Sequence, residues 1–152
     1  MNSTRKSSPN KYCLIIPGRG YAHTAEHAKQ YKEKIKRIAQ KSIPKPFNRE
    51  VDVRLEYLYR NREERLDGDN LLKTICDALE GIAYTNDSQI VHHEVTAINM
   101  NSSFIIRGVP LDQQIGDLFA NKESFTIIRL RKVSKGRSAQ TTLIEETQYG
   151  KK

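Results

Sequence analysis

The segment 51–59 reads Val-Asp-Val-Arg-Leu-Glu-Tyr-Leu-Tyr and alternates apolar and polar side chains almost strictly. Because successive side chains of a β-strand point to opposite faces, this alternation predicts a strand with one face in a hydrophobic core. Apolar runs at 12–16, 89–98 and 125–133 predict further strands. A β-sheet is therefore expected at the centre of the fold.

Two helices are expected between these strands. Thr24 can cap a helix that ends near Lys41, and apolar residues at helical spacing predict a second helix over 69–83. The segment 99–123 is an irregular excursion with a helical turn near 111–119. The order strand, helix, strand, helix, strand, strand indicates an α+β fold, one domain with a mixed β-sheet and two main helices.

Length and charge narrow the functional class. With 152 residues, the chain is expected to form one folded domain at 11–133, flanked by flexible tails at 1–10 and 134–152. The formal net charge of +8 favours a polyanionic partner, chiefly nucleic acid. No apolar run reaches the roughly 20 residues needed to span a bilayer, so no membrane insertion is expected. Cys13 and Cys76 are isolated thiols that fit a reducing compartment, and we expect a cytoplasmic protein.

Acidic residues gather in one short stretch of this basic chain. Projected as a helix, the stretch places Asp69, Lys73 and Asp77 on the side opposite its apolar residues. Asp67 precedes the helix and can cap it. An antiparallel return of the next strand would bring Asp87 toward Asp67. The sequence thus predicts a cluster of three carboxylates at one end of the sheet.

Three carboxylates packed together repel one another unless a cation lies between them. Oxygen ligands favour Mg²⁺, with Mn²⁺ as an alternative, and such an ion suits phosphodiester hydrolysis. Lys73, one turn after Asp69, would donate to a phosphate oxygen as negative charge accumulates. The same spacing is also typical of a solvated helix face that carries surface ion pairs. Both interpretations remain open from spacing alone.

The combined motif is more specific than an Asp-x-Asp pair. It reads Asp67-x-Asp69-Asn70-Leu71-x-Lys73-x3-Asp77-Ala78-Leu79, followed by Asp87-x-Gln89-Ile90-Val91. In these residues the chain resembles the RusA family of Holliday-junction resolvases, also called crossover junction endodeoxyribonucleases. The resemblance is dense over 67–91 and extends thinly, mostly as element order, from the first strand to about Val133. Asn86 stands where many members carry a second consecutive acid, and 99–123 is longer than the usual connection.

The resemblance implies a Mg²⁺-dependent homodimer that resolves four-way DNA junctions by paired symmetric nicks, in DNA recombination and repair. The roles it implies are metal binding and catalysis for Asp67, Asp69 and Asp87, catalysis for Lys73, and support for Asn70 and Asp77. Basic residues near the motif are the expected DNA contacts: Arg19, Lys29, Lys36, Arg60, Arg62 and Arg65.

Three other functions are compatible with the same residues. One is a non-catalytic junction-binding protein with a degenerate site, supported by Asn86 alone. Another is a metal-dependent phosphoesterase that acts on a smaller substrate. The last is a domain whose acidic stripe is only a solvated surface.

Overall fold

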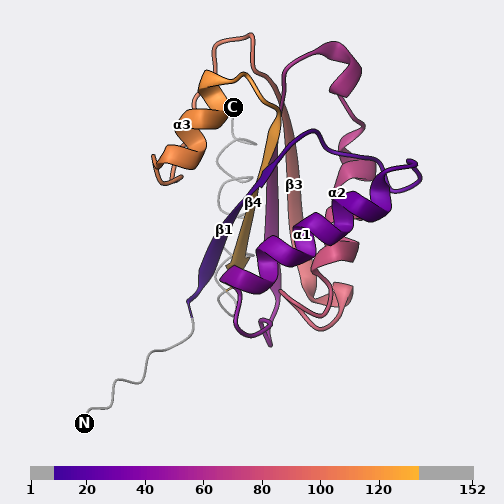
Figure 1. The fold of residues 1–152 in the computed structure, drawn as a ribbon. Helices are drawn as coiled ribbons and strands as arrows, with labels where there is room; N and C mark the ends of the chain where they lie inside the picture. Colours follow the sequence, from indigo (N-terminus) through magenta and orange to yellow (C-terminus); the bar gives the residue numbers. More distant parts are fainter. Residues whose placement is uncertain (1–8, 134–152) are drawn as a thin grey trace, which may run out of the picture.

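The computed structural model describes residues 9–133 (Figure 1). The predicted tails at 1–10 and 134–152 lie outside the described residues, apart from Pro9 and Asn10. The main elements in chain order are β1 (Lys11–Pro17), α1 (Ala28–Ser42), β2 (Val51–Tyr59), α2 (Gly68–Leu79), β3 (Ile90–Asn99), α3 (Gln113–Ala120) and β4 (Phe125–Lys132). Short 3₁₀ turns, η1 (Arg62–Glu64) and η2 (Asp87–Gln89), precede α2 and β3.

The strands form one mixed sheet in the order β1-β4-β2-β3. β4 pairs antiparallel with both β1 and β2, whereas β3 runs parallel to β2. A parallel pair needs a crossover connection, and α2 supplies it between β2 and β3. The predicted α+β domain with a mixed sheet and two main helices is confirmed, with α3 as a third, shorter helix.

One face of the sheet carries the main core. α1 and α2 pack side by side on it (Figure 1), and inward side chains of β2 such as Val53, Leu55 and Tyr57 are buried beneath them. Tyr31 and Ile35 of α1 reach the same core. The alternation along β2 therefore has the expected physical cause, because every second residue faces the helices.

The opposite face is covered over only part of its length. α3 and the preceding loop pack against Leu58, Phe125 and Ile127, and they form a second, smaller core. The 99–123 excursion thus covers part of the outer face. Its helical part is α3 at Gln113–Ala120, where a helical turn near 111–119 was expected. Within residues 9–133, no helix combines the length and apolar character that a membrane crossing requires.

Two predicted helix boundaries were wrong. α1 begins at Ala28, because a turn in which the Ala25 N–H bonds to the Ala22 carbonyl intervenes, and Thr24 stands outside the helix. α2 ends at Leu79 instead of 83. Gly81, at φ +87°, adopts the left-handed conformation that terminates helices, and its N–H bonds to the Tyr84 carbonyl.

Candidate active site

The first turn of α2 presents two carboxylates side by side. Asp67 is the N-cap, as predicted: its Oδ1 accepts from the Asp69 backbone N–H at 3.2 Å, and its Oδ2 accepts from Asn70 Nδ2 at 3.4 Å. Both aspartates are exposed, and the positive end of the helix dipole favours negative charge there. The chain thus holds two oxygen donors close together without neutralising either.

The remainder of α2 divides into a buried face and an exposed stripe. Leu71, Ile75 and Leu79 are buried, while Asp69, Lys73 and Asp77 are exposed, as the helical projection predicted. Asp77 differs from the other two because a histidine and a lysine nitrogen lie close to it. Its Oδ2 lies 3.2 Å from His23 Nδ1 and 3.7 Å from Lys32 Nζ. These contacts tie α2 to α1 and the loop before it, which suits a supporting role.

Asp87 does not join this pair within one chain. It opens η2 just before β3, and its charge, with that of Asp77, adds to burial in raising the pKa of Cys76 to about 11. Asp87 therefore lies toward the C-terminal end of α2. Asp67 lies at the other end of this 12-residue helix, which is about 18 Å long at 1.5 Å per residue.

The position of α2 along β3 gives the same result. A Cβ on Gly68 would come within 3.3 Å of Val95 Cγ1, so the N-terminus of α2 sits halfway along β3, whereas Asp87 precedes the first residue of that strand. The expected antiparallel return was wrong, because the strand after α2 pairs parallel with β2. Within residues 9–133, no three His, Cys, Asp or Glu side chains are close enough to hold one metal ion.

An open cleft of about 520 Å³ adjoins Asp67. Its lining consists of Arg62, Arg65, Leu66, Asp67, Gly68, Val95 and Ala97. Two guanidinium groups therefore lie beside one metal-type ligand, at the free edge of the sheet. Arginine binds phosphate oxygens through a planar fork of donors, so this combination suits a phosphodiester.

The amino-acid sequence was also compared with known families. The family described as endodeoxyribonuclease RusA matches residues 7–105, which is more than half of the chain. The chain belongs to the RusA family. The match includes the acidic motif and the cleft, and it ends before α3. No curated protein matches the chain closely enough to count as a relative.

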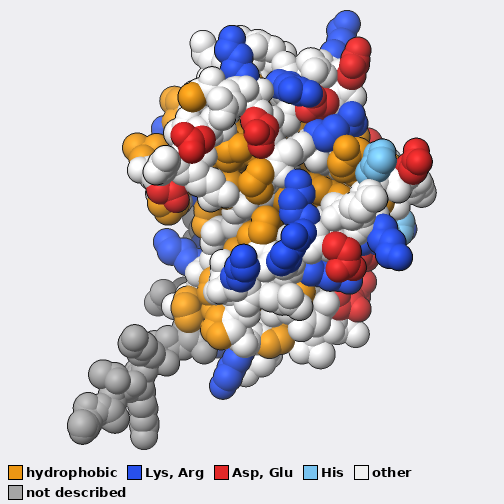
Figure 2. Space-filling model, viewed as in Figure 1, with side chains coloured by type: hydrophobic (Ala, Val, Ile, Leu, Met, Phe, Trp, Pro, Cys, Tyr) orange, Lys and Arg blue, Asp and Glu red, His pale blue; other side chains and the backbone are white. Residues whose placement is uncertain are grey.

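The other basic residues expected to contact DNA differ in their surroundings in this RusA-family chain. Lys29 is exposed on α1, and Lys36 lies 3.8 Å from Glu33 on the same helix. Figure 2 shows lysine and arginine side chains gathered over the face where α1 runs. Arg19 stacks its guanidinium 4.9 Å from the centre of the Tyr21 ring.

Arg60 is already engaged, since its Nε donates to Glu64. Asn86, where many family members carry an acid, has a local role here. Its side chain accepts from the Ser88 N–H at 2.8 Å and forms a capping box with Gln89, so it starts η2. That hydrogen bonding explains why an amide is compatible with the position.

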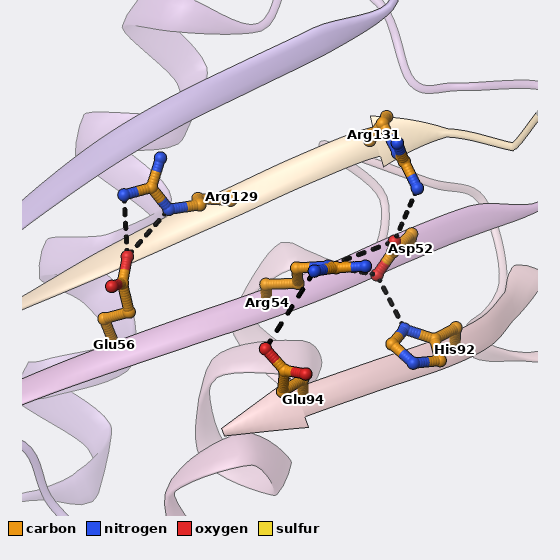
Figure 3. A network of polar contacts seen from close by, with 7 residues as sticks. All are labelled: Asp52, Arg54, Glu56, His92, Glu94, Arg129 and Arg131. Carbon is orange, nitrogen blue, oxygen red and sulfur yellow. Dashed lines mark hydrogen bonds and ion pairs between the residues drawn. The ribbon is translucent and has the colours of Figure 1, made fainter. Parts of the chain in front are cut away.

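A charged network on the outer face of the sheet was not predicted from the sequence (Figure 3). Asp52 is buried on β2 and accepts from His92 Nδ1 at 3.0 Å, Arg54 Nε at 3.3 Å and Arg131 Nη2 at 3.2 Å. Burial alone would raise the pKa of Asp52, but the hydrogen bonds and charges of His92 and Arg54 outweigh it and hold the pKa below its ordinary value. The network joins β2, β3 and β4.

The sequence alone does not distinguish Asp52 from a solvated strand residue, because it occupies a polar position of the 51–59 alternation. Once buried, its carboxylate needs partners. The partner could not be named without the register, which sets Asp52 opposite His92. His92 is thus a strand histidine that bonds to Asp52.

Proposed function

We propose that this protein is a metal-dependent, structure-specific endodeoxyribonuclease that resolves four-way DNA junctions by paired symmetric nicks, in recombination and repair. The observation that carries the proposal is the RusA-family match over a chain segment where Asp67 lines an arginine-containing cleft and Asp69 follows two residues later on α2. Family membership supplies the nuclease class, and the cleft supplies a site suited to a backbone phosphate.

Asp67, Asp69 and Asp87 are the proposed ligands of Mg²⁺, for which Mn²⁺ can substitute. The donor set fits a hard cation, since Asp67 and Asp69 offer exposed carboxylate oxygens on one helical turn. When bound, the ion would lower the pKa of a water molecule and stabilise negative charge on the phosphate. Lys73, exposed one turn further along α2, would donate to a phosphate oxygen.

The third ligand is proposed to come from a second copy of the chain. Asp87 and Asp67 lie toward opposite ends of α2. One chain therefore brings at most two of the three carboxylates, Asp67 and Asp69, to the same end of the helix. A homodimer would place Asp87 of the partner subunit beside Asp67 and Asp69. β3 is an edge strand that pairs only with β2 among the described strands, so it leaves a free edge next to the cleft for such an approach.

The proposed DNA contacts divide by distance from the carboxylates. Arg62 and Arg65 line the cleft and are the first candidates for the scissile phosphate. Lys29 and Lys36 on α1, and Arg19 in the preceding loop, are candidates for more distant phosphates of a junction arm. Arg60 ranks below them because Glu64 holds its guanidinium.

A cleavage assay tests the proposal. The substrates are a synthetic four-way junction and a linear duplex of the same sequence, each with Mg²⁺ or a chelator. Loss of a carboxylate ligand is expected to lower the rate of junction cleavage by more than about 100-fold. This exceeds the usual effect of losing a residue that only orients a metal ligand. Asp69→Asn should therefore bind the junction without cutting it, while Asp117→Asn, an exposed aspartate on α3, should cut normally.

Three outcomes would contradict the proposal. Normal Mg²⁺-dependent cleavage by Asp69→Asn would remove the carboxylates from the chemistry. Tight junction binding by the wild-type protein, without cleavage in either metal, would indicate the non-catalytic function. Turnover of a nucleotide or a flap in place of the junction would indicate a phosphoesterase with a smaller substrate.

A further inference from the structure

A buried glutamate lies three residues before the first catalytic carboxylate. Glu64 is 4% exposed, although it belongs to the charged segment 60–65, the link between β2 and α2. Its Oε2 accepts from Arg60 Nε at 2.5 Å and Asn61 Nδ2 at 3.2 Å, and its Oε1 accepts from Ser124 Oγ at 2.5 Å. Since Ser124 directly precedes β4, the side chain joins this link to the central sheet.

The backbone of Glu64 is held as well. Its carbonyl accepts from Tyr57 Oη, and the same hydroxyl accepts from the Gly20 N–H at 3.1 Å. Tyr57 belongs to β2 and is buried. Three segments therefore meet at Glu64: the loop after β1, the end of β2 with η1, and the start of β4.

The loop at Gly20 also packs against residues on both sides of Asp67 and Asp69. A Cβ at this glycine would lie 2.8 Å from Leu71 Cδ1 and 3.3 Å from Leu66 Cδ1. Leu66 directly precedes Asp67, and Leu71 follows Asp69 by two residues. A side chain at this position would displace the Leu71 methyl group, so glycine lets the loop pack against residues on both sides of the carboxylates.

A buried carboxylate is costly unless each oxygen has a partner, and Glu64 meets that condition. Burial would raise the pKa of Glu64, but hydrogen bonds from Ser124 and Arg60 and the charge of Arg60 hold the pKa below its ordinary value. The side chain therefore stays ionised at neutral pH. An ionised anchor with three donors restrains the link more firmly than an apolar residue would.

We propose that Glu64 is a positioning residue, which acts through the backbone at 64–66 to hold Asp67 and Asp69 in the geometry for metal binding. This inference rests on the proposed function. It also assigns Arg60, an exposed side chain whose Nε donates to Glu64, to the support of this link rather than to a DNA contact.

The experiment compares Glu64→Ala, Glu64→Gln and the matched control Glu63→Gln, an exposed neighbour in the same 3₁₀ turn. Junction cleavage gives kcat, and binding in Ca²⁺ gives the junction Kd. Hydrogen exchange of peptides covering 60–72 reports the link directly. For Glu64→Ala we expect kcat to fall about 10- to 100-fold, as for residues that orient ligands, with Kd unchanged within about twofold.

Glu64→Gln keeps the shape and one acceptor oxygen, so it should recover part of the lost kcat. Exchange should accelerate at 60–72 in Glu64→Ala and remain unchanged in α1. Wild-type kcat in both Glu64 variants would overturn the proposal, as would equal acceleration in α1, which indicates general destabilisation. If the wild-type protein cuts no junction, the proposed function fails, and the exchange result alone decides whether Glu64 holds the link.

Discussion

Replacing Asp52 by asparagine removes the central anion of the outer-face network. The carboxylate is 4% exposed and lies within 3.0–3.3 Å of nitrogen atoms of His92, Arg54 and Arg131. Asparagine has nearly the same volume, so packing is preserved. It offers a single acceptor oxygen, and its NH₂ group would face side-chain nitrogens that are themselves hydrogen-bond donors.

The exposure of the partners sets the size of the effect. Breaking a fully buried ion pair costs about 3–5 kcal/mol and an exposed pair less than about 1 kcal/mol. Here the anion is buried, but the three side chains that bond to it are 44–57% exposed and regain water when it is lost. We therefore expect Asp52→Asn to lower the free energy of unfolding by about 2 kcal/mol at pH 7. For a chain of this size, that is a fall in Tm of about 4–8 °C.

The loss should depend on pH in a defined direction. The pKa of Asp52 is lower in the folded protein than its ordinary value of 3.8, so the folded state binds the proton less readily than the unfolded chain. The stabilisation is complete above the unfolded pKa and disappears as the pH falls through the folded pKa. Urea denaturation should thus show a gap between the proteins at pH 7 that narrows below about pH 4.

The difference between the two proteins isolates this one group, because their other carboxylates titrate alike. Asp117→Asn serves as the control and should match the wild type at every pH, since this exposed aspartate forms no ion pair within residues 9–133. Equal stability of the two proteins at pH 7 would show that the Asp52 carboxylate does not stabilise the fold. A gap that stays constant down to pH 2 would show that the effect comes from packing and not from charge.

Other measurements test the core and the thiols. Ile35→Ala, at a fully buried α1 position under the sheet, should lower the free energy of unfolding by about 2–5 kcal/mol, and a loss below about 1 kcal/mol by urea denaturation would contradict the assigned core. Cys13 is exposed, whereas burial raises the pKa of Cys76 to about 11, so a thiol reagent at pH 8 should modify Cys13 first and Cys76 only on unfolding. Equal rates for the two thiols would argue against the position of α2.

Periodic segments of the fold could be predicted because burial on one face is visible in the sequence. The 51–59 alternation fixed β2, and helical spacing identified the buried side of α2 together with its stripe of Asp69, Lys73 and Asp77. The N-cap at Asp67 also followed from local chemistry. These features depend on neighbours within one helix or strand, so no knowledge of the tertiary arrangement was needed.

Features that depend on strand direction and register could not be predicted. The position of Asp87 required knowing that β3 runs parallel to β2, and a sequence of this length allows either direction. The same holds for Asp52, whose partners come from β3 and β4 as well as its own strand. Glu64 is one of several charged residues at 60–65, and only the folded chain brings Ser124 to it.

In the proposed enzyme, Asp67 and Asp69 of one subunit form the metal site together with Asp87 of the partner subunit. Mixed dimers of Asp69→Asn and Asp87→Asn chains, purified through two different tags, test this arrangement. Each parent dimer should be inactive, but the mixed dimer would contain one intact site and one site with both changes. We predict that the mixed dimer nicks one strand of a four-way junction in Mg²⁺. A mixed dimer as inactive as its parents would contradict a shared site.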